Sequence, residues 1–473
     1  MGLLFTAKAQ YLKCMSQSDL FTSRRNFIKA AGLTGAASLI MASSVQAETG
    51  GKKASGKAKN IIYLVADGMG NGTLGLAHHW YLRKHGELMP YSQLLQHPAM
   101  HRSMQDTASA SSPVTDSAAA ASSWGCGQRV NNGSINVSTE GEHLKPILSY
   151  AKEAGMATGL VTTCRITHAT PAGFAANVEK RGMEQEILLQ YLDRKIDVLL
   201  GGGDKFFDAK LYTDFEAAGY AVAKNKDKLK AAGASDRLLG IFSRSHMPYA
   251  IDRANQPALG KVPGLVDMFA AGLKSLERSK NGFLLQVEAG RVDHAAHGND
   301  AGAILHEMLE FNETVSFAID YIEQHPDTLL IITTDHGTGG CQLNGQGSAY
   351  SDSGPALDRI EGISTSFEWL EDRFMADGKF DPDYFQQVTG VTASPDQIAR
   401  VNDLIGKKVE YLSSAMTKLF DPELQALTAV GWTTNNHTSE CVDLFAFGPG
   451  AAQVPAYVKN YEMFGIMRSS LGI

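Results

Sequence analysis

The stretch NIIYLVADGMG, residues 60–70, decides the fold of this chain. Its first seven residues form a continuous apolar run, which is typical of a strand buried on both faces of a parallel sheet. The run ends directly at Asp67-Gly68-Met69-Gly70, where two glycines favour a tight turn. A carboxylate therefore follows the first strand, at the sheet edge where parallel sheets collect their ligands.

Further apolar runs of strand length alternate with helical patterns along the chain. The expected strands are 157–163, 196–200, 282–287, 328–333 and 442–447. The expected helices are 146–154, 183–194, 266–278 and 301–324, with 365–375 and 396–406 as shorter pieces. This alternation predicts an α/β fold with a mostly parallel central sheet and helices on both faces.

The alternation stops between residues 342 and 431, where Gly, Ser, Asp and Pro clusters separate short helical pieces. We expect this segment to be an insertion outside the sheet. The main α/β domain would then comprise residues 60–341 and 432–473. Residues 48–59 are rich in Gly, Lys and Ala and are expected to form a flexible tether.

The first 47 residues have the pattern of a twin-arginine signal peptide. Ser23-Arg24-Arg25-Asn26-Phe27-Ile28-Lys29 precedes a mildly apolar run at 30–42, and small residues lead to Ala47. The apolar run is too short for a transmembrane helix, and its alternative is an alanine-rich amphipathic helix. The pattern predicts export by the twin-arginine (Tat) machinery to the periplasm, with cleavage after Ala47.

Composition and charge disfavour a nucleic-acid-binding protein. The 473 residues are 44% hydrophobic and 20% charged, as in ordinary soluble enzymes. The net charge is −7, and the first 47 residues contribute +4, which leaves −11 for the remainder. An acidic chain without aromatic–basic interleaving is expected to have no nucleic-acid-binding surface. Four cysteines beyond residue 47 form no metal-binding C-x-x-C pattern, and their disulfide state stays open.

A hydroxyl at Ser117 follows a carboxylate and precedes an alanine run in Thr115-Asp116-Ser117-Ala118-Ala119-Ala120-Ala121. The alanines predict a helix that starts at this point, and helix N-termini favour anions. Ser117 could hold a phosphate or attack one. The alternative is that Thr115 or Asp116 only caps the helix.

Several carboxylates and imidazoles have the chemistry and the placement of metal ligands. Asp293 and His297 are four residues apart, so a helix would present both on one face. Asp335 and His336 are adjacent where a strand ends, and His437 lies in Asn435-Asn436-His437-Thr438. Such groups suit Zn²⁺, and their gathering at strand ends predicts a two-metal site.

Five motifs occur in one order: D-G-M-G (67–70), T-D-S-A-A (115–119), V-E-A-G-R-V-D-H-A-A-H (287–297), T-T-D-H-G (333–337) and H-T (437–438). Together they resemble the alkaline phosphatase family over essentially the whole chain after the signal. The resemblance implies a first zinc site, a second zinc site and a magnesium site. Their ligands would be Asp293, His297 and His437; then Asp67, Asp335, His336 and Ser117; then Glu288, Thr170 and an oxygen of Asp67.

The resemblance also assigns roles around the metals. Arg181 would clamp the phosphate with its planar guanidinium, and Arg165 is the competing residue for that role. Asp116, His168 and His294 are expected to support the ligands, although a histidine at 168 could draw zinc to the third site. The insertion would be of the crown type, and the enzyme would be a homodimer.

The implied activity is hydrolysis of phosphate monoesters through a phosphoserine on Ser117, with two zinc ions and one magnesium ion. One alternative is a relative that acts on phosphodiesters or sulfate esters, although such relatives tend to use Thr or a modified Cys as nucleophile. The non-enzyme alternative is a periplasmic phosphate- or zinc-binding protein.

Overall fold

The computed structural model describes residues 57–232 and 235–473. The expected signal peptide (1–47) and most of the expected tether (48–59) lie outside the described residues. Among the described residues, no helix is both long enough and apolar enough to cross a membrane.

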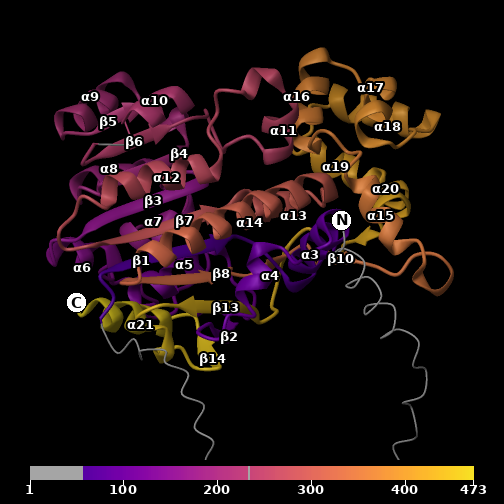
Figure 1. Ribbon diagram of the computed structural model, residues 1–473. Helices are drawn as coiled ribbons and strands as arrows, with labels where there is room; N and C mark the ends of the chain where they lie inside the picture. Colours follow the sequence, from indigo (N-terminus) through magenta and orange to yellow (C-terminus); the bar gives the residue numbers. More distant parts are fainter. Residues whose placement is uncertain (1–56, 233–234) are drawn as a thin grey trace, which may run out of the picture. The chain divides into compact units, whose positions relative to one another are not determined.

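A ten-stranded sheet forms the centre of the described chain (Figure 1). Strand β1 (Asn60–Ala66) lies between β7 (Phe283–Ala289) and β8 (Thr328–Thr333) and is parallel to both. The strand order is β14 (Tyr457–Lys459), β2 (His101–Asp106), β13 (Val442–Phe447), β8, β1, β7, β3 (Ala157–Arg165), β4 (Val198–Gly202), β6 (Leu238–Ile241) and β5 (Ala221–Ala223). Strand β13 runs antiparallel to both of its neighbours, and the other pairs in this sheet are parallel.

Alternate residues of β1 enter two separate hydrophobic cores, one on each face of the sheet. Ile62 and Leu64 pack into the first core, and Ile61 and Tyr63 pack into the second. This period of two explains why β1 is hydrophobic from Ile61 to Ala66, since neither face meets water. The expected doubly covered, mostly parallel sheet is confirmed.

Helices cover both faces (Figure 1). The first core takes side chains from α3 (Asn71–His85), α4 (Pro90–Leu94), α10 (Lys226–Ala232), α11 (Ala250–Asn255), α12 (Leu265–Leu276), α13 (Arg291–His297), α14 (Ala301–Gln324) and α15 (Ser353–Ile360). The second takes them from α5 (Ser117–Cys126), α6 (Ile147–Glu153), α7 (Ala169–Ala175), α8 (Glu184–Asp193), α9 (Ala209–Ala217) and α21 (Glu462–Leu471).

A third core, in which phenylalanine is the most frequent buried residue, lies between five further helices, which are grouped in Figure 1. These are α16 (Phe367–Asp377), α17 (Pro382–Thr389), α18 (Pro395–Gly406), α19 (Leu412–Leu419) and α20 (Asp421–Thr428). Two short antiparallel pairs lie outside the ten-stranded sheet: β10 (Gln342–Leu343) with β11 (Val430–Gly431), and β9 (Gly337–Thr338) with β12 (His437–Thr438).

Candidate active site

Three buried carboxylates lie at the carboxyl ends of the three central strands. Asp67 follows β1, Asp335 comes two residues after β8, and Glu288 is the second-last residue of β7. All three side chains are at most 1% exposed. Gly68 allows this crowding, because its φ is +74° and a Cβ there would approach Asp293 Cα to 2.7 Å. Its backbone N–H donates to Asp335 Oδ1 at 3.1 Å.

The first expected zinc group is brought together. Asp293 and His297 lie on α13, and His437 begins β12. Their ligand atoms all lie within 4.8 Å of one another, and His297 Nε2 is 3.0 Å from His437 Nε2. Each of these imidazoles has its Nδ1 beside a backbone carbonyl, Asn435 O for His297 and Thr115 O for His437. Because Nδ1–H donates to a carbonyl, Nε2 is the nitrogen that each neutral imidazole offers to a cation, and the two Nε2 atoms face each other.

The second expected zinc group is also brought together. The ligand atoms of Asp67, Asp335 and His336 lie within 4.8 Å of one another. His336 Nε2 is 3.1 Å from Asp335 Oδ2 and 3.7 Å from Asp67 Oδ1. Its Nδ1 lies 3.2 Å from Thr338 Oγ1, so this imidazole too can present a bare Nε2 to the carboxylates.

Ser117 is the first residue of α5, as the alanine run predicted. Its Oγ lies 3.3 Å from His336 Nε2, which joins the serine to the second group. Asp116 caps the helix, since its Oδ1 accepts the Ala119 N–H at 3.0 Å. Asp116 therefore caps the helix, which leaves the hydroxyl of the adjacent Ser117 free to contact a phosphate.

The expected magnesium residues adjoin the second group. Thr170 Oγ1 donates to Asp67 Oδ2 at 3.3 Å, and Thr162 Oγ1 donates to Glu288 Oε2 at 2.5 Å. Oxygen donors of this kind are what Mg²⁺ prefers. His168 and Cys164 form a ligand-sized group with Glu288, so softer atoms also border this position.

Arg181 is held at the site by two side chains. Its Nη1 donates to Asp116 Oδ2 at 3.1 Å, and its Nη2 lies 2.9 Å from His168 Nε2. The competing residue, Arg165, is instead committed to Glu184, whose two oxygens it contacts at 2.7 to 3.1 Å. The geometry favours Arg181 over Arg165 as the phosphate clamp.

Burial and mutual repulsion perturb the carboxylates and imidazoles. Burial, followed by the nearby Asp335, raises the pKa of Asp67 well above its usual range, and burial raises the pKa of Glu288 to about 7. Burial and the adjacent His336 lower the pKa of His437 to about 4. Against burial, the Asp293 carboxylate raises the pKa of His297 to about 9. Crowded carboxylates facing imidazole nitrogens are the arrangement that a cation stabilises.

Sequence reasoning missed several contributors. Thr338 Oγ1 donates to Asp293 Oδ1 at 2.6 Å and lies 3.2 Å from His336 Nδ1, so it links the two expected zinc groups. Thr162, which donates to Glu288, lies inside a strand and carries no motif signal.

His294 does not join the Asp293 group and instead lies beside Cys164 and His246. The cysteines Cys126, Cys164, Cys341 and Cys441 are all free thiols in the described structure.

Comparison with known proteins agrees with this geometry. The family model described as "Alkaline phosphatase" matches residues 58–473. Alkaline phosphatase 3 of Bacillus subtilis is 33% identical over 86% of this chain and 87% of its own. The crystal structure of Thermus thermophilus alkaline phosphatase has a TM-score of 0.80 and 34% identity, and covers 88% of this chain and 92% of that one.

A second solved structure, the cold-active alkaline phosphatase of a Shewanella species, has a TM-score of 0.75 and 29% identity over 87% of this chain and 99% of that one. The match to the family model spans every strand of the sheet. On this evidence of fold, site and sequence, the chain is an enzyme that belongs to the alkaline phosphatase family.

Proposed function

We propose that this enzyme hydrolyses phosphate monoesters through a phosphoserine formed on Ser117. The observation that carries the proposal is the position of the Ser117 hydroxyl. It lies at the N-terminus of α5, 3.3 Å from His336 Nε2. Arg181 lies nearby, because it donates to Asp116, the residue that caps this helix. A nucleophile, an anion-binding helix end and a guanidinium thus surround one point.

The residues present fit two zinc ions and one magnesium ion. Among the described residues, no donor satisfies the buried oxygens Asp67 Oδ1, Asp335 Oδ2 and Glu288 Oε1. Unpartnered buried carboxylate oxygens are costly unless a cation meets them. The two groups of imidazole and carboxylate suit Zn²⁺, and the Glu288, Thr170 and Asp67 oxygens suit Mg²⁺.

When bound, these metals would act as Lewis acids that stabilise negative charge on the phosphoryl and serine oxygens. The protein itself positions the reaction. The Ser117 Oγ–phosphorus bond forms while the bond from phosphorus to the alcohol oxygen breaks, and the serine proton passes through solvent to the departing alcohol oxygen. Arg181, oriented by Asp116 and His168, holds phosphoryl oxygens through its planar fork. Water then splits the phosphoserine and releases inorganic phosphate.

The test is covalent capture of phosphate on Ser117. We expect acid quenching during turnover of a labelled monoester to trap label on the wild-type chain. The Ser117→Ala variant should keep its metals, trap no label and lose at least about a thousand-fold in kcat. The matched control is Ser123→Ala on the same helix, whose hydroxyl donates to Ala119 O. Unchanged turnover in Ser117→Ala would refute the nucleophile.

Related chemistries on this fold make phosphodiesters and sulfate esters the rival substrates. Ser117 together with Arg181 favours monoesters, since a monoester has three non-bridging oxygens and the guanidinium fork can hold two of them while the third faces the metal groups, whereas a diester has only two in all. Comparing kcat/KM for an aryl phosphate, a bis-aryl phosphate and an aryl sulfate separates these classes. Family membership already disfavours a pure phosphate- or zinc-binding protein.

We further propose that the enzyme is exported to the periplasm through the Tat machinery and forms a homodimer. The first proposal rests on Arg24 and Arg25 and the apolar run after them. Replacing both arginines with lysine should leave phosphatase activity in the cytoplasmic fraction. Sedimentation of the mature enzyme tests the dimer, and a monomer mass would contradict it.

A further inference from the structure

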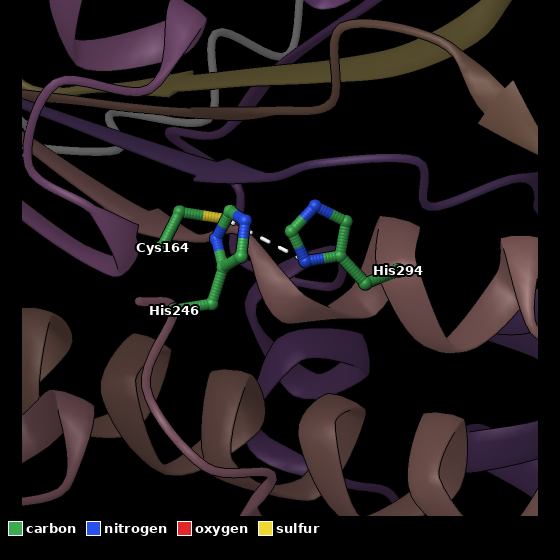
Figure 2. A group of neighbouring side chains, drawn as sticks. All are labelled: Cys164, His246 and His294. Atoms are coloured by element: carbon green, nitrogen blue, oxygen red, sulfur yellow. Dashed lines mark hydrogen bonds between the residues drawn. The ribbon is translucent and has the colours of Figure 1, made fainter. Parts of the chain in front are cut away.

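Cys164, His246 and His294 form a compact group beside the residues of phosphate hydrolysis. Cys164 is the second-last residue of β3, His246 lies between β6 and α11, and His294 lies on α13. Figure 2 shows the three side chains turned towards one another, with Cys164 Sγ 3.9 Å from His294 Nδ1. One ligand atom from each residue lies within 4.8 Å of the others. None of the three is a ligand of the expected zinc and magnesium groups.

The spacing and the chemistry of this group match a soft divalent cation. Tetrahedral Zn²⁺ bound to a thiolate and an imidazole holds the sulfur and the nitrogen about 3.5 Å apart. The distance between Cys164 Sγ and His294 Nδ1 is therefore only a few tenths of an ångström longer than coordination needs. A thiolate and two imidazoles select zinc or cobalt over magnesium.

The surroundings leave room for an ion and a way in. A Cβ at Gly290 would lie 2.6 Å from Cys164 Sγ, so the glycine keeps the space beside the sulfur free. His246 and His294 both line a cavity of about 720 Å³, which also borders His297. Three protein ligands leave a fourth position for water or another molecule, and the cavity supplies that access.

Two arginines now contact the imidazoles, and both keep other partners if an ion displaces them. Arg291 Nη1 lies 2.7 Å from His294 Nδ1, yet the same guanidinium pairs with Glu368 at 2.7 Å and stacks over the Tyr249 ring. Arg165 Nη1 contacts His246 Nε2, but Glu184 holds Arg165 through both oxygens. Because each arginine is paired with a carboxylate, the positive charge around the group is largely balanced.

We propose that Cys164, His246 and His294 bind a zinc-like divalent cation at a site additional to the metals of phosphate hydrolysis. Binding forms one metal–sulfur bond and two metal–nitrogen bonds, and the thiol proton passes to the solvent. No oxidation or reduction is involved. The ion ties the end of β3 and the loop before α11 to α13, which also carries Asp293 and His297.

Cobalt substitution of the full enzyme tests the site without any measurement of turnover. A thiolate bound to Co²⁺ gives a sulfur-to-metal charge-transfer absorption band, which imidazole and carboxylate ligands do not give. We expect this band in the wild type, together with one more metal equivalent per chain than the phosphatase groups require. The band and the extra equivalent should both disappear in Cys164→Ser and in His246→Gln. Cys341→Ser, which removes another buried free thiol, should retain both.

These variants also distinguish this site from an alternative one, in which Cys164 binds the cation together with His168 and Glu288. In that case the band would survive His246→Gln and disappear in His168→Gln, which would overturn the proposal. Absence of the band from the wild type at saturating Co²⁺ would also overturn it. His246 is partly exposed, so His246→Gln keeps the test sound even if Cys164→Ser disturbs the core. Because the readout is spectroscopic, its failure is independent of any failure of the phosphoserine proposal.

Discussion

Single hydrogen bonds set the chemistry of the three ligand imidazoles. His297 and His437 each donate Nδ1–H to a backbone carbonyl, and His336 places its Nδ1 beside Thr338 Oγ1. In the neutral imidazoles these contacts place the proton on Nδ1 and leave Nε2 as the nitrogen available to a cation. The three Nε2 atoms converge because the three Nδ1 atoms are held by the protein. The site is therefore organised for cations before any cation binds.

Replacing Arg181 with lysine tests the phosphate clamp. Lysine keeps the charge but loses the planar fork and its simultaneous contacts with Asp116 and His168. We expect kcat/KM for an aryl phosphate to fall about 10- to 100-fold. The matched control is Arg165→Lys, which should change kcat/KM little because Glu184 occupies that guanidinium. A large loss in the control with none in Arg181→Lys would move the clamp to Arg165.

The metal ligands could be found from sequence, but their supporting partners could not. Asp67 and Asp335 were found because each lies within two residues of the end of an apolar strand, and Asp293 and His297 because they share a helical face. Thr338 gives no such signal, because its role depends on β9 pairing with β12 across about a hundred residues. Cys164 and His246 likewise meet only through the fold. The metal-binding and catalytic roles themselves stay predictions.

At the scale of elements, helix α5 owes its position to close contact with α7. A Cβ at Gly125 would lie 1.9 Å from Gly173 O, and a Cβ at Gly173 would lie 2.6 Å from Ala121 Cβ. The helices therefore approach more closely than alanine would allow. Since α5 begins at Ser117 and α7 contains Thr170, this packing sets the proposed nucleophile against the expected magnesium residues.

Gly173→Ala should disturb both stability and activity through this contact. The added methyl group pushes α5 away from α7, and we expect unfolding free energy to fall by about 1–3 kcal/mol. Denaturant unfolding and kcat on the same preparation measure the two effects. Gly465→Ala on α21 is the control, because its Cβ would meet nothing within 4 Å. That variant should be unchanged or up to about 1 kcal/mol more stable. Equal stability of Gly173→Ala and the wild type would contradict the packing argument.

The elements that could be predicted from sequence are those marked by a continuous apolar run or a long helical pattern. The apolar strands at 60–66, 328–333 and 442–447 and the helix at 301–324 are confirmed at their expected bounds. Strand β2 (His101–Asp106, HRSMQD) was missed, because it lies nearer the sheet edge and has no apolar run. The antiparallel direction of β13 could not be predicted either, because the residues of a strand do not determine its direction relative to its neighbours. The division at residues 342–431 stays a prediction.

At the scale of the whole molecule, a buried carboxyl group outside the site, that of Glu307, also affects the stability of the fold. Glu307 on α14 accepts the Ala250 N–H through one oxygen at 2.6 Å, which fastens α11 to the longest helix of the described chain. Its other oxygen is buried without a hydrogen-bond partner among the described residues. Burial, followed by the nearby Glu310, raises the pKa of Glu307 from 4.5 to about 7.

This raised pKa predicts a pH-dependent stability. The folded state keeps the Glu307 proton more tightly than the unfolded state, so its contribution is present at acid pH and is lost as pH rises towards 7. Relative to Glu307→Gln, we expect the wild type to lose roughly 2 kcal/mol between about pH 5.5 and about pH 8. Denaturant unfolding of both proteins at each pH gives this difference, and effects of metal loss cancel in it. Glu323→Gln, an exposed change on the same helix, should show no such trend.

The place of β13 has a consequence for biosynthesis. This strand comes late in the chain, yet it pairs with β8 beside the centre of the sheet, and His437 lies just before it. A ribosome that has made the first four hundred residues has already produced Asp67, Ser117, Asp293 and Asp335. The nascent polypeptide still lacks the imidazole that faces His297. Assembly of the pocket therefore waits until residues 437–473 have been translated, and a prematurely terminated product has no complete site.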